Sequence, residues 1–163
     1  MQEFFQGLGF SQNLAGDLSL LAILVAASIL LGSVIGRFRL VHLILHIYIS
    51  YAILLALPED MLAFSAYAEV IVFFGVLILL TTLGDRLFDI HARASVYGWI
   101  STLILGFLSA GLLLGMLFRL LPGESFLWDV FSSHSVGYFT GEWVFTGWLI
   151  APLVFLVFVN TRR

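Results

Sequence analysis

The sequence has no cysteine and no lysine, and only 10% of its 163 residues are charged. Without cysteine, the chain has no disulfide, no thiolate metal ligand and no thiol nucleophile. Its seven basic residues are all arginine and its formal net charge is −3, so it lacks the clustered Lys and Arg that nucleic-acid binding requires. We therefore exclude nucleic acid as a partner.

Apolar side chains dominate what is present. Hydrophobic residues make up 61% of the chain, and its mean hydropathy is +1.10. A soluble domain carries roughly a quarter charged residues, far more than this sequence provides. The composition predicts an integral membrane protein, with residues 1–163 forming a single helical membrane domain in contact with the lipid bilayer.

Five apolar runs approach the length of a membrane span. A bilayer core about 30 Å thick needs about 20 apolar residues in a helix, and the alternating strands of a membrane barrel do not occur in this sequence. Residues 1–16 lack the basic region of a cleavable signal peptide, so we expect the first run to remain as a mature helix. The predicted fold is all-α with five transmembrane helices, at about residues 18–36, 40–57, 62–84, 97–121 and 143–159.

The arginines predict the orientation, because Arg in short loops near span ends stays on the cytoplasmic side. Arg119 is the one arginine on the opposite side, near the end of the fourth run, where its long stem can reach the interface. This puts the N-terminus outside and the C-terminus in the cytoplasm; a four-span alternative leaves the fifth run in the interface. The arginines on the cytoplasmic side are Arg37, Arg39, Arg86, Arg93, Arg162 and Arg163.

Two segments between the runs mix apolar and polar residues. Residues 85–95 alternate charges with Leu and Phe, and residues 124–141 mix aromatic residues with Ser, His and Gly. Such composition is typical of interfacial segments and aromatic belts. We expect both segments to lie at the membrane surface as anchors.

Small residues recur at four-residue spacing on the first and fourth runs. In lipid, helices associate by close backbone packing, which small side chains permit. Packing within one bundle and packing between two copies of the chain are both open. The predicted helix-packing residues are Ser28, Gly32, Gly36, Gly98, Gly106, Ala110, Gly111 and Gly115.

Glu69 interrupts the third apolar run and is the strongest candidate for a functional residue. At seven residues into a run that starts at Leu62, it is expected about 10 Å below the membrane edge. An ionisable group at that depth is expensive and often functional, so we expect Glu69 to face protein. Tyr51 and Tyr67 are possible partners.

His42, His46 and Ser50 recur every four residues on the second run, so one helical face carries two imidazoles and a hydroxyl. If this run packs against the third, Glu69 can approach the level of Ser50 and His46. Such a polar lane could relay protons, since His titrates near neutrality. The other interpretation is that these groups hydrogen-bond one another and hold the helices together.

The sequence gives little support for a cofactor or an enzyme. His42 and His46 supply only two metal ligands, and His91 and His134 fall outside the predicted spans. Ser109 is the nearest nucleophile candidate, but no histidine is predicted on the third to fifth spans. We expect no metal, no cofactor and no enzymatic activity.

The order of features resembles the colicin V production protein family of bacterial inner-membrane proteins. An early span after an acidic residue, a Gly-Arg turn, a charged connector and a Gly-rich span carry the resemblance over about residues 17–121. It implies a multi-pass inner-membrane protein that supports export or envelope homeostasis without catalytic residues. The residues that carry it are Asp17, Gly32, Gly36, Arg37, Arg39, Gly98, Gly106 and Gly111.

We therefore expect a non-enzymatic inner-membrane protein that assembles with other membrane proteins or with itself. A small proton-linked transporter or channel subunit is the first alternative, with the polar lane as its path. A holin-like pore former is the second, because the short length and the number of spans permit it.

Overall fold

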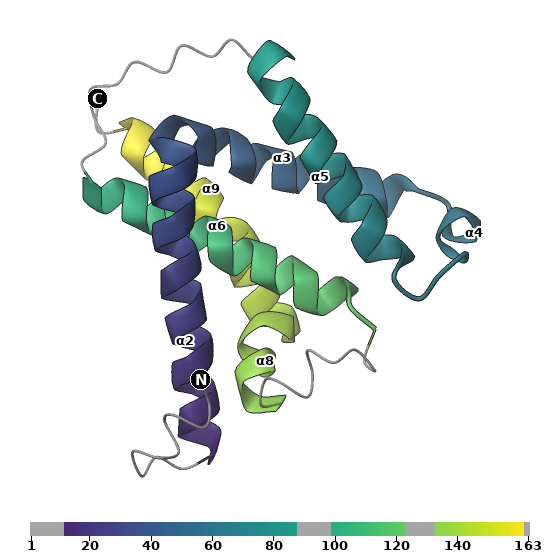
Figure 1. The fold of residues 1–163 in the computed structure, drawn as a ribbon, viewed down its shortest axis with the longest axis horizontal. Helices are drawn as coiled ribbons and strands as arrows, with labels where there is room; N and C mark the ends of the chain where they lie inside the picture. The colour runs from purple at the N-terminus through teal and green to yellow at the C-terminus, as the bar shows by residue number, and fades with distance from the viewer. Residues whose placement is uncertain (1–11, 88–98, 123–132, 162–163) are drawn as a thin grey trace.

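The computed structural model describes residues 12–87, 99–122 and 133–161 (Figure 1). These residues contain helices and no strand, which confirms the all-α class for the described part of the chain. The helices in chain order are α2 (Gln12–Leu30), the π-helix η1 (Leu31–Ile35), α3 (Gly36–Ala56), α4 (Glu59–Leu62), α5 (Ala68–Leu87), α6 (Trp99–Leu120), α8 (Ser133–Thr140) and α9 (Glu142–Thr161).

The first two predicted runs are joined by a helical corner. We expected a turn at Gly36-Arg37-Phe38-Arg39, but α2 continues through η1 directly into α3, which already starts at Gly36. Figure 1 shows that the chain changes direction here, so that α2 runs across α3 and α6. A π-helical turn is a known cause of a sharp bend within a helix. The predicted turn was therefore wrong.

The third helix begins later than predicted. Residues 58–67 form a connection that contains the single-turn helix α4, and α5 starts at Ala68 and not near Leu62. The backbone N–H of Ala68 donates to the Ser65 carbonyl, and the N–H of Tyr67 donates to the Ser65 hydroxyl oxygen at 3.2 Å. These bonds close a turn within residues 62–67, which the predicted third span included because they are mostly apolar.

The bounds of the fourth and fifth predicted spans agree with the structure, whereas parts of the two predicted interfacial segments lie outside the described residues. Helices α6 and α9 start and end within two residues of the predicted runs. Asp85–Leu87 complete α5, whereas residues 88–95 and 124–132 lie outside the described part, so those portions of the two interfacial segments have no description. The remainder of the second segment forms α8, whose Val136 and Phe139 are buried.

Helix α6 lies at the centre of the bundle and contacts α2, α3, α5, α8 and α9. One core cluster joins α3, α5, α6 and α9, with Ile44, Phe73 and Met116 fully buried. A second cluster joins α2, α6 and α8 through Leu24 and Phe118. Both clusters depend on α6, so its position fixes the others.

Trp148 of α9 links α8 to this centre. Its ring stacks on Phe139 at 5.4 Å between centroids, and its indole N–H donates to the Tyr138 carbonyl at 3.1 Å. The same ring covers Gly111 of α6, where an added Cβ would collide with it. Helix α8 is therefore packed into the bundle, although we expected a surface anchor.

Large apolar side chains point outward from every long helix, while several serines point inward. Buried polar residues are Ser19, Ser28, His46, Ser50 and Ser109. The exposed apolar side chains include Leu21, Ile29, Leu45, Leu55, Ile71, Ile78, Trp99, Ile100, Ile150 and Val157. Exposed apolar side chains on every long helix favour lipid or protein, rather than water, as their neighbour.

Among the residues that the structure describes, two helices contain a stretch long and apolar enough to cross a membrane, namely Arg39–Ala56 and Trp99–Leu120. The apolar parts of the other three long helices are shorter and cover Asp17–Ser33, Ala68–Gly84 and Glu142–Phe158. By length and composition, two of the five predicted spans are thus candidates for crossing a membrane.

Helices α2 and α6 touch backbone to backbone where they cross. The Ser28 hydroxyl donates to the Leu103 carbonyl at 3.1 Å, and a Cβ on Gly106 would lie 2.6 Å from the Ser28 carbonyl oxygen. Gly32 lies against Thr102 in the same crossing. The small residues of these two helices therefore serve packing within the bundle.

Replacing Gly106 by Ala should force α2 and α6 apart. Overpacking of this kind costs about 1–3 kcal/mol, which we expect as a lower free energy of unfolding in mixed micelles, followed by circular dichroism. Gly75→Ala on α5 is the matched control, because nothing lies within 4 Å of a Cβ at that position. Equal stability of the two variants would contradict the close crossing.

Candidate functional site

The polar face of α3 is built as its four-residue spacing predicts. His42 and His46 stack with ring centroids 6.4 Å apart and an interplanar angle of 26°. His46 is 4% exposed and Ser50 is fully buried. Among the described residues, the Ser50 hydroxyl has no hydrogen-bond partner. The face therefore points into the bundle.

His46 packs against Gly84, near the C-terminal end of α5. A Cβ on Gly84 would lie 2.5 Å from His46 Cε1, so the missing side chain provides the space for the imidazole. Gly84 is itself buried. The predicted spacing thus identified this face of α3, and Gly84 of α5 lies against it.

Glu69 does not approach the histidines. It lies in the first turn of α5 and is exposed, because α5 starts only at Ala68. Positions 69 and 84 are 15 residues apart on this helix, a rise of about 22 Å. A carboxylate in a first turn is favoured by the helix dipole. The expected position of Glu69 beside His46 was therefore wrong.

Glu69 instead lines a pocket at the opposite end of α3. This pocket, of about 300 Å³, is also lined by Tyr51, Glu59 and Arg119 and by five leucines from α3, α4, α6 and the α3–α4 connection. Tyr51 thus shares a site with Glu69, as expected, whereas Tyr67 is exposed and does not line it. The lining combines two carboxylates, a guanidinium and an apolar wall. We call it the charged pocket.

An aromatic pair from two helices supports Arg119. Its guanidinium lies 4.5 Å from the centre of the Phe145 ring, an attractive cation–π geometry. Phe145 is buried and meets Tyr51 edge to face at 6.2 Å. Within the described ranges, no ion pair joins Arg119 to Glu59 or Glu69. The three charges therefore face the pocket without neutralising one another.

Sequence reasoning treated Arg119 only as an interfacial residue and gave Glu59 no role. A signal was available, since the predicted topology puts Glu59, Glu69 and Arg119 on the same side of the membrane. Their convergence also required the packing of α6 beside α3, which no local pattern reveals.

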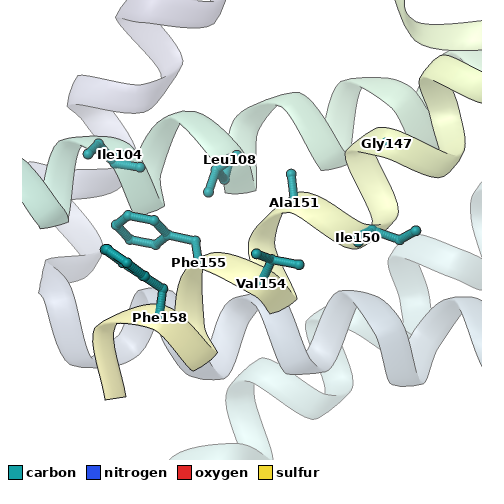
Figure 2. Close-up of a pocket in the computed structure, with 8 residues that line it drawn as sticks. All are labelled: Ile104, Leu108, Gly147, Ile150, Ala151, Val154, Phe155 and Phe158. Atoms are coloured by element: carbon teal, nitrogen blue, oxygen red, sulfur yellow. The ribbon is translucent and has the colours of Figure 1, made fainter. Parts of the chain in front are cut away.

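An apolar groove runs between α6 and α9 (Figure 2). It has a volume of about 600 Å³ and includes Ile104 and Leu108 of α6 and Phe155 and Phe158 of α9. Gly147 lies on its wall, and nothing approaches within 4 Å of a Cβ there. In a bilayer, this groove is a surface for an acyl chain or another helix.

The remaining predicted packing residues lie mostly along α6. Gly111 receives Trp148, as described above, and Gly115 lies against the Phe145 ring, 3.5 Å from where its Cβ would be. Ala110 is buried in the cluster with α2 and α8. Gly36 is the first residue of α3, but its surroundings are not described. Gly98 lies outside the described residues.

The structure places Ser109 in the interior of α6, where its hydroxyl donates to the Leu105 carbonyl at 2.7 Å. Within the described ranges, no three His, Asp or Glu side chains are grouped to hold a metal ion. His91 lies outside these ranges, and the side chain of His134 is not described.

Tyr48 of α3 reaches a proline-disturbed turn of α9. Pro152 has no N–H and its ring crowds the carbonyls one turn before it. The Tyr48 hydroxyl donates a hydrogen bond to the carbonyl of Leu149, three residues before Pro152. The carbonyl that loses its intrahelical donor to Pro152 is that of Trp148, four residues before it. The Tyr48 hydroxyl therefore gives the neighbouring Leu149 carbonyl an additional donor, which ties α3 to α9.

Comparison with protein families, curated proteins and solved structures finds no match to this chain.

Tyr48→Phe should weaken the contact between α3 and α9, because it leaves the Leu149 carbonyl without this donor. We expect the free energy of unfolding to fall by about 1–2 kcal/mol in the same micelle assay. Tyr67→Phe is the control, since Tyr67 is exposed. A Tyr48→Phe protein as stable as the control would mean that the carbonyl is satisfied in another way.

Proposed function

We propose that the chain is a non-enzymatic, multi-pass protein of the bacterial inner membrane that supports export or envelope homeostasis. The carrying observation is the distribution of side chains: large apolar groups cover the outside of all long helices, while serines and a histidine lie inside. This arrangement suits lipid as the solvent, because helices there associate through small residues and polar contacts.

The proposed topology has five spans, α2, α3, α5, α6 and α9, with the N-terminus outside. The shorter apolar segments of α2, α5 and α9 are near the lower limit for crossing a bilayer of about 30 Å. The arginine distribution supports this orientation. The resemblance to the colicin V production protein family supports an export or envelope role.

The interior of the bundle suits a structural scaffold better than a path for protons or ions. His46 lies beside Gly84 near the C-terminal end of α5, Glu69 lies in the first turn of α5, and Leu54, Phe73 and Leu77 are buried in the core that joins α3 and α5. Buried apolar side chains of this kind hold helices together and oppose the passage of ions.

Single-cysteine labelling tests the topology cleanly, because the natural chain has no other thiol. We expect a membrane-impermeant maleimide added outside the cell to label Asn13→Cys and Ser65→Cys, and to label Asn160→Cys only after the membrane is permeabilised. Protection of Asn13→Cys, with Ser65→Cys labelled, would mean that α2 lies on the cytoplasmic surface. The direction of α2 across α6 in Figure 1 makes this control essential.

A small proton-linked transporter or channel subunit is the second candidate. The observation that favours it is the presence of titratable groups at two levels of α3, His42 and His46 in its first half and the charged pocket at its C-terminal end. It requires the apolar core between them to open.

Proton flux through purified protein in liposomes separates the two candidates. We expect none above that of protein-free vesicles between pH 5.5 and 8, because the buried core interrupts the path; these pH values bracket the ordinary pKa of His, about 6.5. Flux lost in Glu69→Gln and His46→Ala, but kept in Glu142→Gln, would establish transport and overturn the scaffold proposal. Flux that none of these variants changes would indicate a holin-like pore.

A further inference from the structure

We infer that the charged pocket binds the phosphoethanolamine headgroup of a membrane lipid. The inference depends on the proposed membrane location and adds a ligand of defined chemistry. Its basis is the unusual lining, in which Glu59, Glu69 and Arg119 face one pocket with leucines beside them.

The depth of the pocket matches a headgroup. Both candidate spans end at it, Arg39–Ala56 at the Tyr51–Leu57 wall and Trp99–Leu120 at the Arg119–Leu120 wall. The ends of spans lie where the hydrocarbon core meets the polar headgroups. A ligand here is exposed to lipid on one side and to water on the other.

The charges select a zwitterion. A guanidinium binds a phosphate through paired N–H donors, and the Phe145 ring 4.5 Å from Arg119 holds that guanidinium in place. Two carboxylates then remain for a cation, and a primary ammonium offers three N–H donors to them. An anionic headgroup without an ammonium would satisfy Arg119 but would be repelled by both carboxylates.

The same lining distinguishes ethanolamine from choline. A quaternary ammonium has no N–H, so it cannot donate a hydrogen bond to Glu59 or Glu69, whereas a primary ammonium can. The leucines favour a lipid over a free zwitterion, because they provide apolar surface for the glycerol and the first acyl carbons. A pocket of about 300 Å³ is at the lower end of the size range for small-molecule sites, which suits a headgroup.

Lipid binding to the full chain in detergent, measured by native mass spectrometry, tests this inference. The probes are phosphatidylethanolamine, phosphatidylcholine and phosphatidylglycerol with identical acyl chains. We expect phosphatidylethanolamine to bind about tenfold more tightly than phosphatidylcholine, the ratio set by one charge-assisted hydrogen bond. Equal affinities for these two lipids would overturn the inference.

Variants connect the selectivity to the pocket. Glu69→Gln should abolish the preference for ethanolamine over choline, and Arg119→Gln should weaken both phospholipids. Glu142→Gln is the matched control, because Glu142 also lies exposed in a first helical turn but outside the pocket. Selectivity that survives Glu69→Gln, or that is lost equally in Glu142→Gln, would contradict the assignment. If Glu69→Gln does not fold, Glu59→Gln takes its place with the same expected loss.

Two further measurements distinguish a bound lipid from a free zwitterion, and failure of this inference from failure of the proposed membrane function. Soluble glycerophosphoethanolamine should not displace the lipid at comparable concentration; displacement would show that the site takes a free zwitterion and would overturn the lipid assignment. Carbonate extraction of membranes reports on insertion alone. An inserted wild type without lipid selectivity defeats only this inference, whereas a chain released by carbonate defeats the proposed membrane function as well.

Discussion

The close approach of α2 and α6 at Gly106 is the contact on which the bundle depends. Because α6 has small residues at Gly106, Gly111 and Gly115, the backbone of α2 approaches it at Gly106, and Trp148 and Phe145 of α9 pack against it at Gly111 and Gly115. Van der Waals contact of this density is the main attraction between helices in lipid, where apolar burial gives little. The large side chains of Ile44, Phe73 and Met116 then fill the spaces that the helices enclose.

Much of this fold could be predicted from the sequence, and the failures share a cause. Hydropathy located α6 and α9 well, because each run ends in charged or helix-breaking residues. It failed at α5, where residues 62–67 are apolar enough to extend the run although Ser65 closes a turn. It failed at η1, since a π-helical corner has no hydropathy signal and Gly36-Arg37 resembles a loop.

The candidate site could likewise be predicted only in part from the sequence. Four-residue spacing placed His42, His46 and Ser50 on one helical face, of which His46 and Ser50 are buried, because this spacing follows from helical geometry alone. Their neighbours could not be predicted in this way. His46 lies against Gly84, and Glu69 lines the same pocket as Arg119. Both arrangements depend on where α5 begins and on how α6 lies beside α3. The neighbours of His46 and of Glu69 are therefore set by how the helices are aligned along one another in the folded bundle.

The π-helix η1 also has a consequence for the register of the chain. A π-helical turn holds one residue more than an α-helical turn, and one residue corresponds to about 100° of rotation. The side-chain faces of α3 are therefore turned relative to those of α2, and the Ser28, Gly32 and Gly36 series does not continue as one straight row. Deleting a single residue from Leu31–Ile35 would rephase every contact that α3 makes, so the length of this segment is under tighter constraint than its composition.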